Sequence, residues 1–123
     1  MATSPIRCFE DLIVWQKARR LTGRIYAATR QPPFNRDFGL ANQIQRAAVS
    51  VMANIAEGFE RNSSASYGQF LLIAKSSSAE VQSHLFIARD IGYLNEKEAS
   101  EMIDGAREIS KMLGALHRAV TEA

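Results

Sequence analysis

The sequence predicts an all-α protein, folded as an antiparallel up-down-up-down four-helix bundle. In four segments of the 123-residue chain, apolar residues recur at steps of three and four, which is the helical period. Short stretches rich in Pro, Gly, Asn or Ser separate these segments, and no segment shows the strict alternation of a strand. Four helices joined by such short connections pack most simply as a bundle. The length suits one domain, predicted over residues 9–121 after a frayed tail of residues 1–8.

The first helix is expected to begin near Glu10 and Asp11, where a helix N-terminus favours negative charge, and to reach about Arg30. Its apolar face consists of Val14, Trp15, Ala18, Leu21 and Ile25. Two successive prolines, at positions 32 and 33, end the helix because they cannot donate backbone hydrogen bonds. The following Phe34 is expected to fold back onto the core.

A basic ridge follows a separate stripe of this first helix. Lys17, Arg20 and Arg24 are spaced three and four residues apart, and Arg19 and Arg30 lie nearby. One interpretation is a solvated face whose aliphatic stems cover the core, and the other is a surface that contacts phosphates. Residues 1–61 carry nine basic and five acidic side chains, whereas the rest carries six and eight. This asymmetry permits an anionic partner such as nucleic acid at the N-terminal half.

The second helix is predicted from a cap at Asn35 or Asp37 to about Arg61, and it has two apolar stripes. The first stripe contains Ile44, Ala48, Val51 and Ile55, and the second contains Val49, Met52, Ala56 and Phe59. A surface helix of a monomer needs only one such stripe. The second stripe therefore predicts another partner, which is either a neighbouring helix or the interface with another subunit.

The opposite face of the second helix is polar and has three interpretations. It carries Asn54 and Ser50, which are mediocre helix formers for a merely solvated face. A ligand surface would use Arg46, Asn54 and Arg61 against phosphates or bases, and plain solvent exposure is the third interpretation. We favour a structural polar network, since buried charges need partners, composed of Gln43, Arg46, Ser50, Asn54, Glu57 and, from the third helix, Glu80.

The third helix is predicted from Ala65 to about Ile91, with a centre of small residues at positions 74–79. A serine-rich linker is the alternative, but the apolar period continues in phase across this centre, and small side chains allow a facing helix to approach closely. Gly92 suits the left-handed residue that closes a helix. Asn95, with Glu98 three residues later, predicts the N-cap of a fourth helix that runs through Val120.

No pattern for catalysis or for a cofactor is present. The two histidines do not form the Glu-x-x-His pairs of di-iron bundles, and the single cysteine, Cys8, excludes an intrachain disulfide. Glycine-rich nucleotide-binding motifs are missing as well. We therefore expect no enzyme activity, no catalytic residue, no metal and no cofactor. Without a membrane-length apolar run or a secretory signal, the expected location is the cytoplasm, away from membranes.

Taken together, several motifs resemble the four-helix-bundle proteins encoded in 23S rRNA intervening sequences, a family related to the accessory variability determinant of diversity-generating retroelements. The resemblance covers about residues 9–118 and rests on FEDL (9–12), VWQKA (14–18), QI (43–44), RAA with Ser50 (46–50), NIAEG (54–58), and Ser78 with Glu80. It implies an antiparallel bundle that assembles into a homopentameric barrel with a central pore. For the retroelement branch it further implies binding of a reverse transcriptase and of nucleic acid, and it supplies no catalytic residues.

Two functional hypotheses follow. The first is a non-enzymatic homo-oligomeric scaffold or adaptor that binds RNA or other nucleic acid through Lys17, Arg19, Arg20, Arg24 and Arg30. The alternative is a protein-protein interaction module that docks a partner, such as a reverse transcriptase, without contacting nucleic acid. The net charge of +2 is modest for a nucleic-acid-binding protein.

Overall fold

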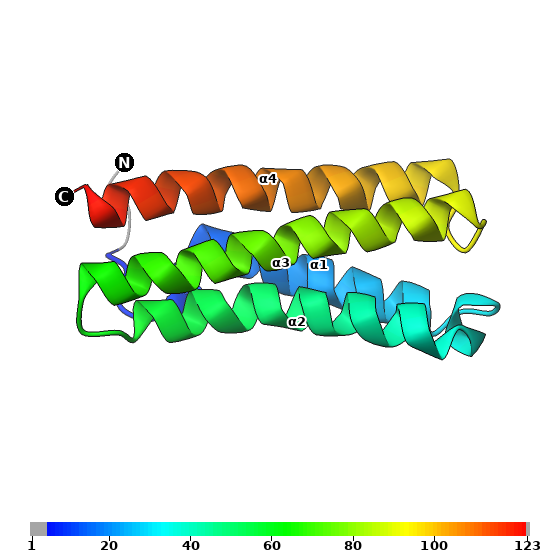
Figure 1. Cartoon of the computed structure of the whole chain (residues 1–123), viewed down its shortest axis with the longest axis horizontal. Coiled ribbons are helices and arrows are strands. Elements are labelled where there is room, and N and C mark those ends of the chain that lie inside the picture. The colour runs from blue at the N-terminus through cyan, green and yellow to red at the C-terminus, as the bar shows by residue number, and fades with distance from the viewer. Residues whose placement is uncertain (1–4, 123) are drawn as a thin grey trace.

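The computed structural model describes residues 5–122, and these form four helices without any strand (Figure 1). The elements, in chain order, are the 3₁₀ turn η1 (Phe9–Asp11), α1 (Ile13–Thr29), the 3₁₀ turn η2 (Phe34–Arg36), α2 (Phe38–Phe59), α3 (Ser64–Asp90) and α4 (Glu96–Thr121). Residues 1–4 of the predicted tail lie outside the described part, and residues 5–8 have no helical structure. The predicted all-α four-helix bundle is confirmed.

Consecutive helices run in opposite directions, so the bundle has the predicted up-down-up-down topology (Figure 1). The most extensive packing joins α3 to α4 and α2 to α3. Helix α1 packs against α2 and α4 over smaller surfaces. The four helices therefore form a closed ring in which α1 is the least extensively packed member.

Side-chain caps define the helix starts. The Asp37 carboxylate accepts a hydrogen bond from Leu40 N at 3.1 Å, and the Asn95 side chain accepts one from Glu98 N at 2.8 Å. Both predicted caps are confirmed, with Asp37 rather than Asn35 capping α2. At the end of α3, Gly92 has φ of +83°, and Tyr93 N donates to Ala88 O at 2.8 Å. This geometry is the left-handed helix termination that the sequence predicts.

The first helix begins later than predicted, because Glu10 and Asp11 belong to η1 rather than to α1. The Asp11 carboxylate accepts hydrogen bonds from the backbone N–H groups of Arg7 and Cys8, at 2.9 and 3.3 Å. These bonds, that of Arg7 first, lower the pKa of Asp11. The extended backbone at Leu12, with φ of −71° and ψ of 123°, then separates η1 from α1.

Phe34 closes one end of the core from a loop position. It is 1% exposed, and its ring stacks on that of Tyr93 with centroids 4.9 Å apart. The Tyr93 hydroxyl donates to Asp37 Oδ2 at 2.9 Å, and this hydrogen bond, together with burial, raises the pKa of Tyr93. The α1–α2 connection and the α3–α4 connection are thus joined at the same end of the bundle.

A small polar bridge crosses the core between α3 and α4. Ser78 Oγ donates to Ala106 O at 2.9 Å and accepts from Ser110 Oγ at 2.8 Å. Gln82 Nε2 in turn donates to Ser110 Oγ at 3.1 Å. The small centre of α3 therefore does face a neighbouring helix, and its buried hydroxyl is satisfied by the backbone of that helix.

Candidate functional site

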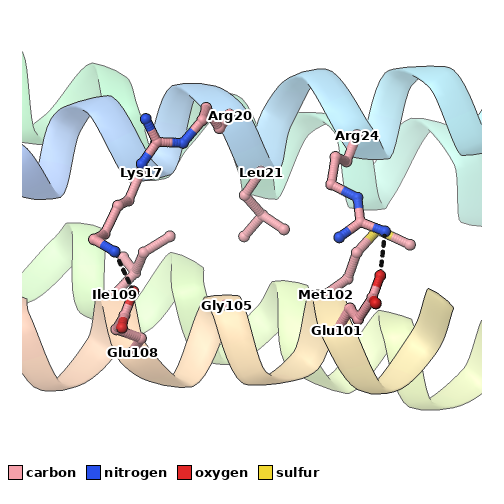
Figure 2. A pocket seen from close by; sticks show the side chains of 9 residues that line it. All are labelled: Lys17, Arg20, Leu21, Arg24, Glu101, Met102, Gly105, Glu108 and Ile109. Atoms are coloured by element: carbon pink, nitrogen blue, oxygen red, sulfur yellow. Dashed lines mark hydrogen bonds and ion pairs between the residues drawn. The ribbon is translucent and has the colours of Figure 1, made fainter. Parts of the chain in front are cut away.

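Two residues of the basic ridge on α1 are paired with carboxylates of α4. Lys17 Nζ lies 2.7 Å from Glu108 Oε1, and Arg24 Nη2 lies 3.1 Å from Glu101 Oε1 (Figure 2). The antiparallel register makes this double pairing possible, because the two basic residues and the two acidic residues are each seven positions apart. Exposed pairs of this kind contribute only about 0–1 kcal/mol each to stability.

A groove of about 230 Å³ lies between these two ion pairs. Leu21, Met102 and Ile109 line it, and Gly105 contributes no side chain, as Figure 2 shows. Arg20 lies between Lys17 and Arg24 but extends along α1 instead of reaching α4 (Figure 2). Within residues 5–122, Arg20 forms no ion pair.

The other two residues predicted for nucleic-acid binding lie over aromatic rings. Arg19 Cζ is 5.7 Å from the centre of the Trp15 ring, and Arg30 Cζ is 5.9 Å from that of Tyr26. Both arginines are exposed, and in the described part of the chain neither pairs with a carboxylate. Arg19, Arg20 and Arg30 are therefore the ridge residues whose charge α4 does not neutralise.

The residues predicted as a polar network on α2 meet α3 at a shallow depression of about 310 Å³. Ser50 Oγ and Ser77 Oγ are 2.8 Å apart, and Asn54 Nδ2 donates to Ser50 O and Oγ at 2.8 and 3.0 Å. The sequence does not predict Ser77 as a member of this network. Three further predicted members, Gln43, Arg46 and Glu80, also line the depression.

The charged members of this set do not pair with one another. Arg46, Glu57 and Glu80 are exposed, and no ion pair among residues 5–122 includes them. Glu57 lies elsewhere, beside a separate depression that Phe9 and Arg61 also line. The hydrogen bonds at this surface thus come from the uncharged side chains alone.

His84 also lines this depression, although the sequence does not predict it as a site residue. Its Nδ1 atom is buried and has no hydrogen-bond partner among the described residues. The only signal in the sequence is its position four residues after Glu80, which places both on one stripe of α3.

The second apolar stripe of α2 is mostly covered by the same chain. Met52, Ala56 and Phe59 pack against the core, and the Phe59 ring meets that of Tyr67 edge-on at 6.2 Å. Val49, in contrast, is 41% exposed. Neighbouring helices therefore account for three of the four residues that the sequence predicts at an oligomer interface.

Among residues 5–122, no three His, Cys, Asp or Glu side chains gather in a way that could hold a metal ion. No helix in the described residues is sufficiently long and apolar to cross a membrane.

Comparison with known proteins gives a family match and a fold match. The family model of the 23S rRNA-intervening sequence protein matches residues 10–115. A solved structure from Bacteroides thetaiotaomicron, a protein with unknown function from the S23 ribosomal protein family, is similar with a TM-score of 0.79 and 24% identity, covering 86% of this chain and 99% of that chain. At this identity the likeness shows the fold alone. No curated protein matches the sequence.

Proposed function

Since this chain belongs to the 23S rRNA-intervening sequence protein family, we propose that it is a non-enzymatic helical scaffold that binds RNA. The observation that carries this proposal is the exposed outer side of α1, where Arg19, Arg20 and Arg30 have no carboxylate partner within residues 5–122. Guanidinium groups bind phosphate oxygens through several donors at once. The family name refers to a 23S rRNA intervening sequence, and RNA is therefore the polyanion we propose. The proposed location is the cytoplasm.

Lys17 and Arg24 have a secondary role in this proposal. Their charges are matched by Glu108 and Glu101, so they hold α1 against α4 and contact RNA only if these ion pairs exchange. The arginines without carboxylate partners supply the main phosphate contacts.

The RNA-binding proposal predicts a strong salt dependence that originates at three residues. The slope of log K against log salt concentration is negative, and each phosphate contact that is lost reduces its magnitude by about one. The triple variant Arg19→Gln, Arg20→Gln, Arg30→Gln is therefore expected to reduce the magnitude of this slope by about three. Fluorescence polarisation of a labelled RNA hairpin and a labelled single strand, titrated at several salt concentrations, measures it.

The matched control is the double variant Lys17→Gln, Arg24→Gln, which also removes positive charge from α1. Its slope is expected to change by less than about one per substitution, because the carboxylates of α4 already neutralise these two side chains. Equal changes per residue in the two variants, or no binding by the unaltered protein at low salt, would refute the assignment to the three arginines.

A second part of the proposal concerns assembly. Three large apolar side chains are exposed, namely Val49 on α2 (41%), Ile73 on α3 (48%) and Ile87 on α3 (44%). By helical spacing, Ile73 and Ile87 lie on the side of α3 that borders α2. These apolar side chains favour self-association through the α2/α3 side, with the pentamer implied by the family resemblance as its specific form. The same surface suits the alternative function, a module that docks another protein.

Self-association predicts an oligomer at micromolar concentration in sedimentation velocity. The double variant Ile73→Ser, Ile87→Ser is expected to shift the population toward monomer, because it removes apolar area from the contact. Leu72 is also exposed but lies three residues before Lys75, whose Nζ lies beside Gly114 of α4, so it belongs to the side of α3 that borders α4 and provides the control variant Leu72→Ser. A monomeric unaltered protein would contradict the assembly proposal.

A further inference from the structure

Helix α4 carries a stripe of basic side chains that is separate from the side of Glu101 and Glu108, although Asp104 also lies on this stripe, three residues before Arg107. Glu101 and Glu108 face α1, where they pair with Arg24 and Lys17. Arg107, Lys111, Gly114 and Arg118 are spaced four, three and four residues apart, so they form one stripe. Arg107 Cζ lies 5.8 Å from the centre of the Phe86 ring of α3, which places Arg107 on the side of α4 toward α3.

The missing side chain of Gly114 brings two cations together on this side. A methyl group at Gly114 would lie 3.6 Å from Lys75 Nζ and 3.6 Å from Arg118 Nη1. The two positive groups, one from α3 and one from α4, are therefore no more than twice that distance apart.

Lys75, Arg107, Lys111 and Arg118 are exposed, and none of them forms an ion pair within residues 5–122. Asp104 and Glu108, each three residues before Arg107 or Lys111, offset part of the repulsion between these two cations. The uncompensated centre is the pair of Lys75 and Arg118 over Gly114. A bound anion would relieve the repulsion of this pair, so the arrangement favours an anionic ligand over empty solvent.

We propose that Lys75, Arg107, Lys111 and Arg118 form a second surface that binds the phosphate backbone of RNA, which we call the α3/α4 basic face. This inference rests on the proposed function and extends it from α1 to a different side of the bundle. Its convergent centre is the pair of cations over Gly114, and Lys111 and Arg107 continue it along α4.

The geometry favours a polymeric anion. From Arg107 to Arg118 the stripe extends about 16 Å along the helix axis, so a single small anion would reach only part of it. Gly114 has no side chain and Ala79 on α3 has only a methyl group, so neither protrudes above the cations. A polynucleotide strand can therefore approach the cations closely. An acidic peptide is the competing ligand, and it is an outcome of the test below.

The test places a carboxylate at the centre of the face. In the variant Gly114→Glu, the new side chain lies next to Lys75 and four residues before Arg118, the favourable order for a helical ion pair, and it replaces a poor helix former. The fold is therefore expected to persist. With two phosphate contacts removed, the affinity for a fluorescein-labelled 20-nucleotide single-stranded RNA is expected to fall on the order of tenfold. The magnitude of the slope of log K against log salt concentration is expected to fall by about two.

Two matched variants make the result specific. Gly114→Gln has nearly the same shape without the charge, so it carries the same steric cost and is expected to lose much less affinity than Gly114→Glu. Gly105→Glu makes the same charge change in the α1/α4 groove, where a Cβ meets nothing within 4 Å and where Lys17 and Arg24 are already paired with carboxylates, so it is the control for net charge. Circular dichroism on all three variants verifies that the helices are intact.

A larger loss of RNA affinity in Gly114→Glu than in Gly114→Gln and Gly105→Glu supports the inference. Unchanged affinity of Gly114→Glu for RNA that the unaltered protein binds overturns it and leaves the proposed function on α1 standing. Equal losses in both glutamate variants indicate a net-charge effect and also overturn it. Tighter binding of a labelled polyglutamate peptide than of the RNA identifies an acidic protein partner and overturns RNA as the ligand. Absence of RNA binding by the unaltered protein also overturns RNA as the ligand.

Discussion

Replacement of Phe34 by alanine is expected to lower the free energy of unfolding by about 3–5 kcal/mol. The side chain is 1% exposed and stacks on Tyr93 at 4.9 Å. Its neighbours at this end of the core include Ile25, Leu94 and Met102, and truncation would leave a cavity among them. Urea denaturation of Phe34→Ala, followed by circular dichroism, measures the loss.

Phe38→Ala is the matched control, since it removes the same side chain four residues later from a position that is 74% exposed. Its effect is expected to remain within about 0.5 kcal/mol. Similar losses from the two variants would mean that Phe34 does not close the core in solution.

The second large effect is expected at Gly58, where substitution by alanine should destabilise the fold by about 1–3 kcal/mol although alanine is the better helix former. A Cβ at this position would lie 2.8 Å from Phe70 Cβ and 3.1 Å from Tyr67 Cδ1. Phe70 Cβ is attached directly to the backbone of α3, so relief requires the two helices to move apart. Thermal and urea unfolding of Gly58→Ala measure the change.

Gly23→Ala is the control for this prediction. Gly23 lies inside α1, and a Cβ there would meet nothing within 4 Å. The gain in helix propensity is therefore unopposed, and the variant is expected to be more stable than the unaltered protein by about 0.5–1 kcal/mol. Opposite signs for the two glycines would locate the close approach of α2 and α3 at Gly58.

The fold was predictable because its signals are local. The caps at Asp37 and Asn95, the left-handed Gly92 and the period of each apolar face are decided within a few residues of one another. Helix α1 starts later than the sequence predicts, and the reason is also local. Asp11 favours a helix N-terminus by charge, but its carboxylate instead binds the backbone of Arg7 and Cys8 and forms η1.

The candidate sites were less predictable because they depend on which helices are neighbours. Lys17 and Glu108 are 91 residues apart, and their pairing follows only from the register of α1 against α4. The α3/α4 basic face has the same origin. The second half of the chain is net acidic, and this count conceals that Glu101 and Glu108 face α1 while Arg107 and Arg118 lie on the side of α4 toward α3.

The predicted polar network shows the same limit at the scale of single residues. The helical period correctly placed Ser50 and Asn54 on one stripe, but the sequence could not identify Ser77 as the hydroxyl across from them. It also did not reveal the buried bridge of Ser78 and Ser110, because a serine in a helix is equally compatible with solvent.

The modest packing of α1 has a consequence for how the bundle opens. This helix contains 17 residues, against 26 or more in α3 and α4, and its contacts with α4 include ion pairs that remain open to solvent. Segments with few buried contacts detach at a lower free energy than the whole domain unfolds. We therefore expect α1 to separate first as a cooperative unit, while α2, α3 and α4 persist as a partly open three-helix intermediate.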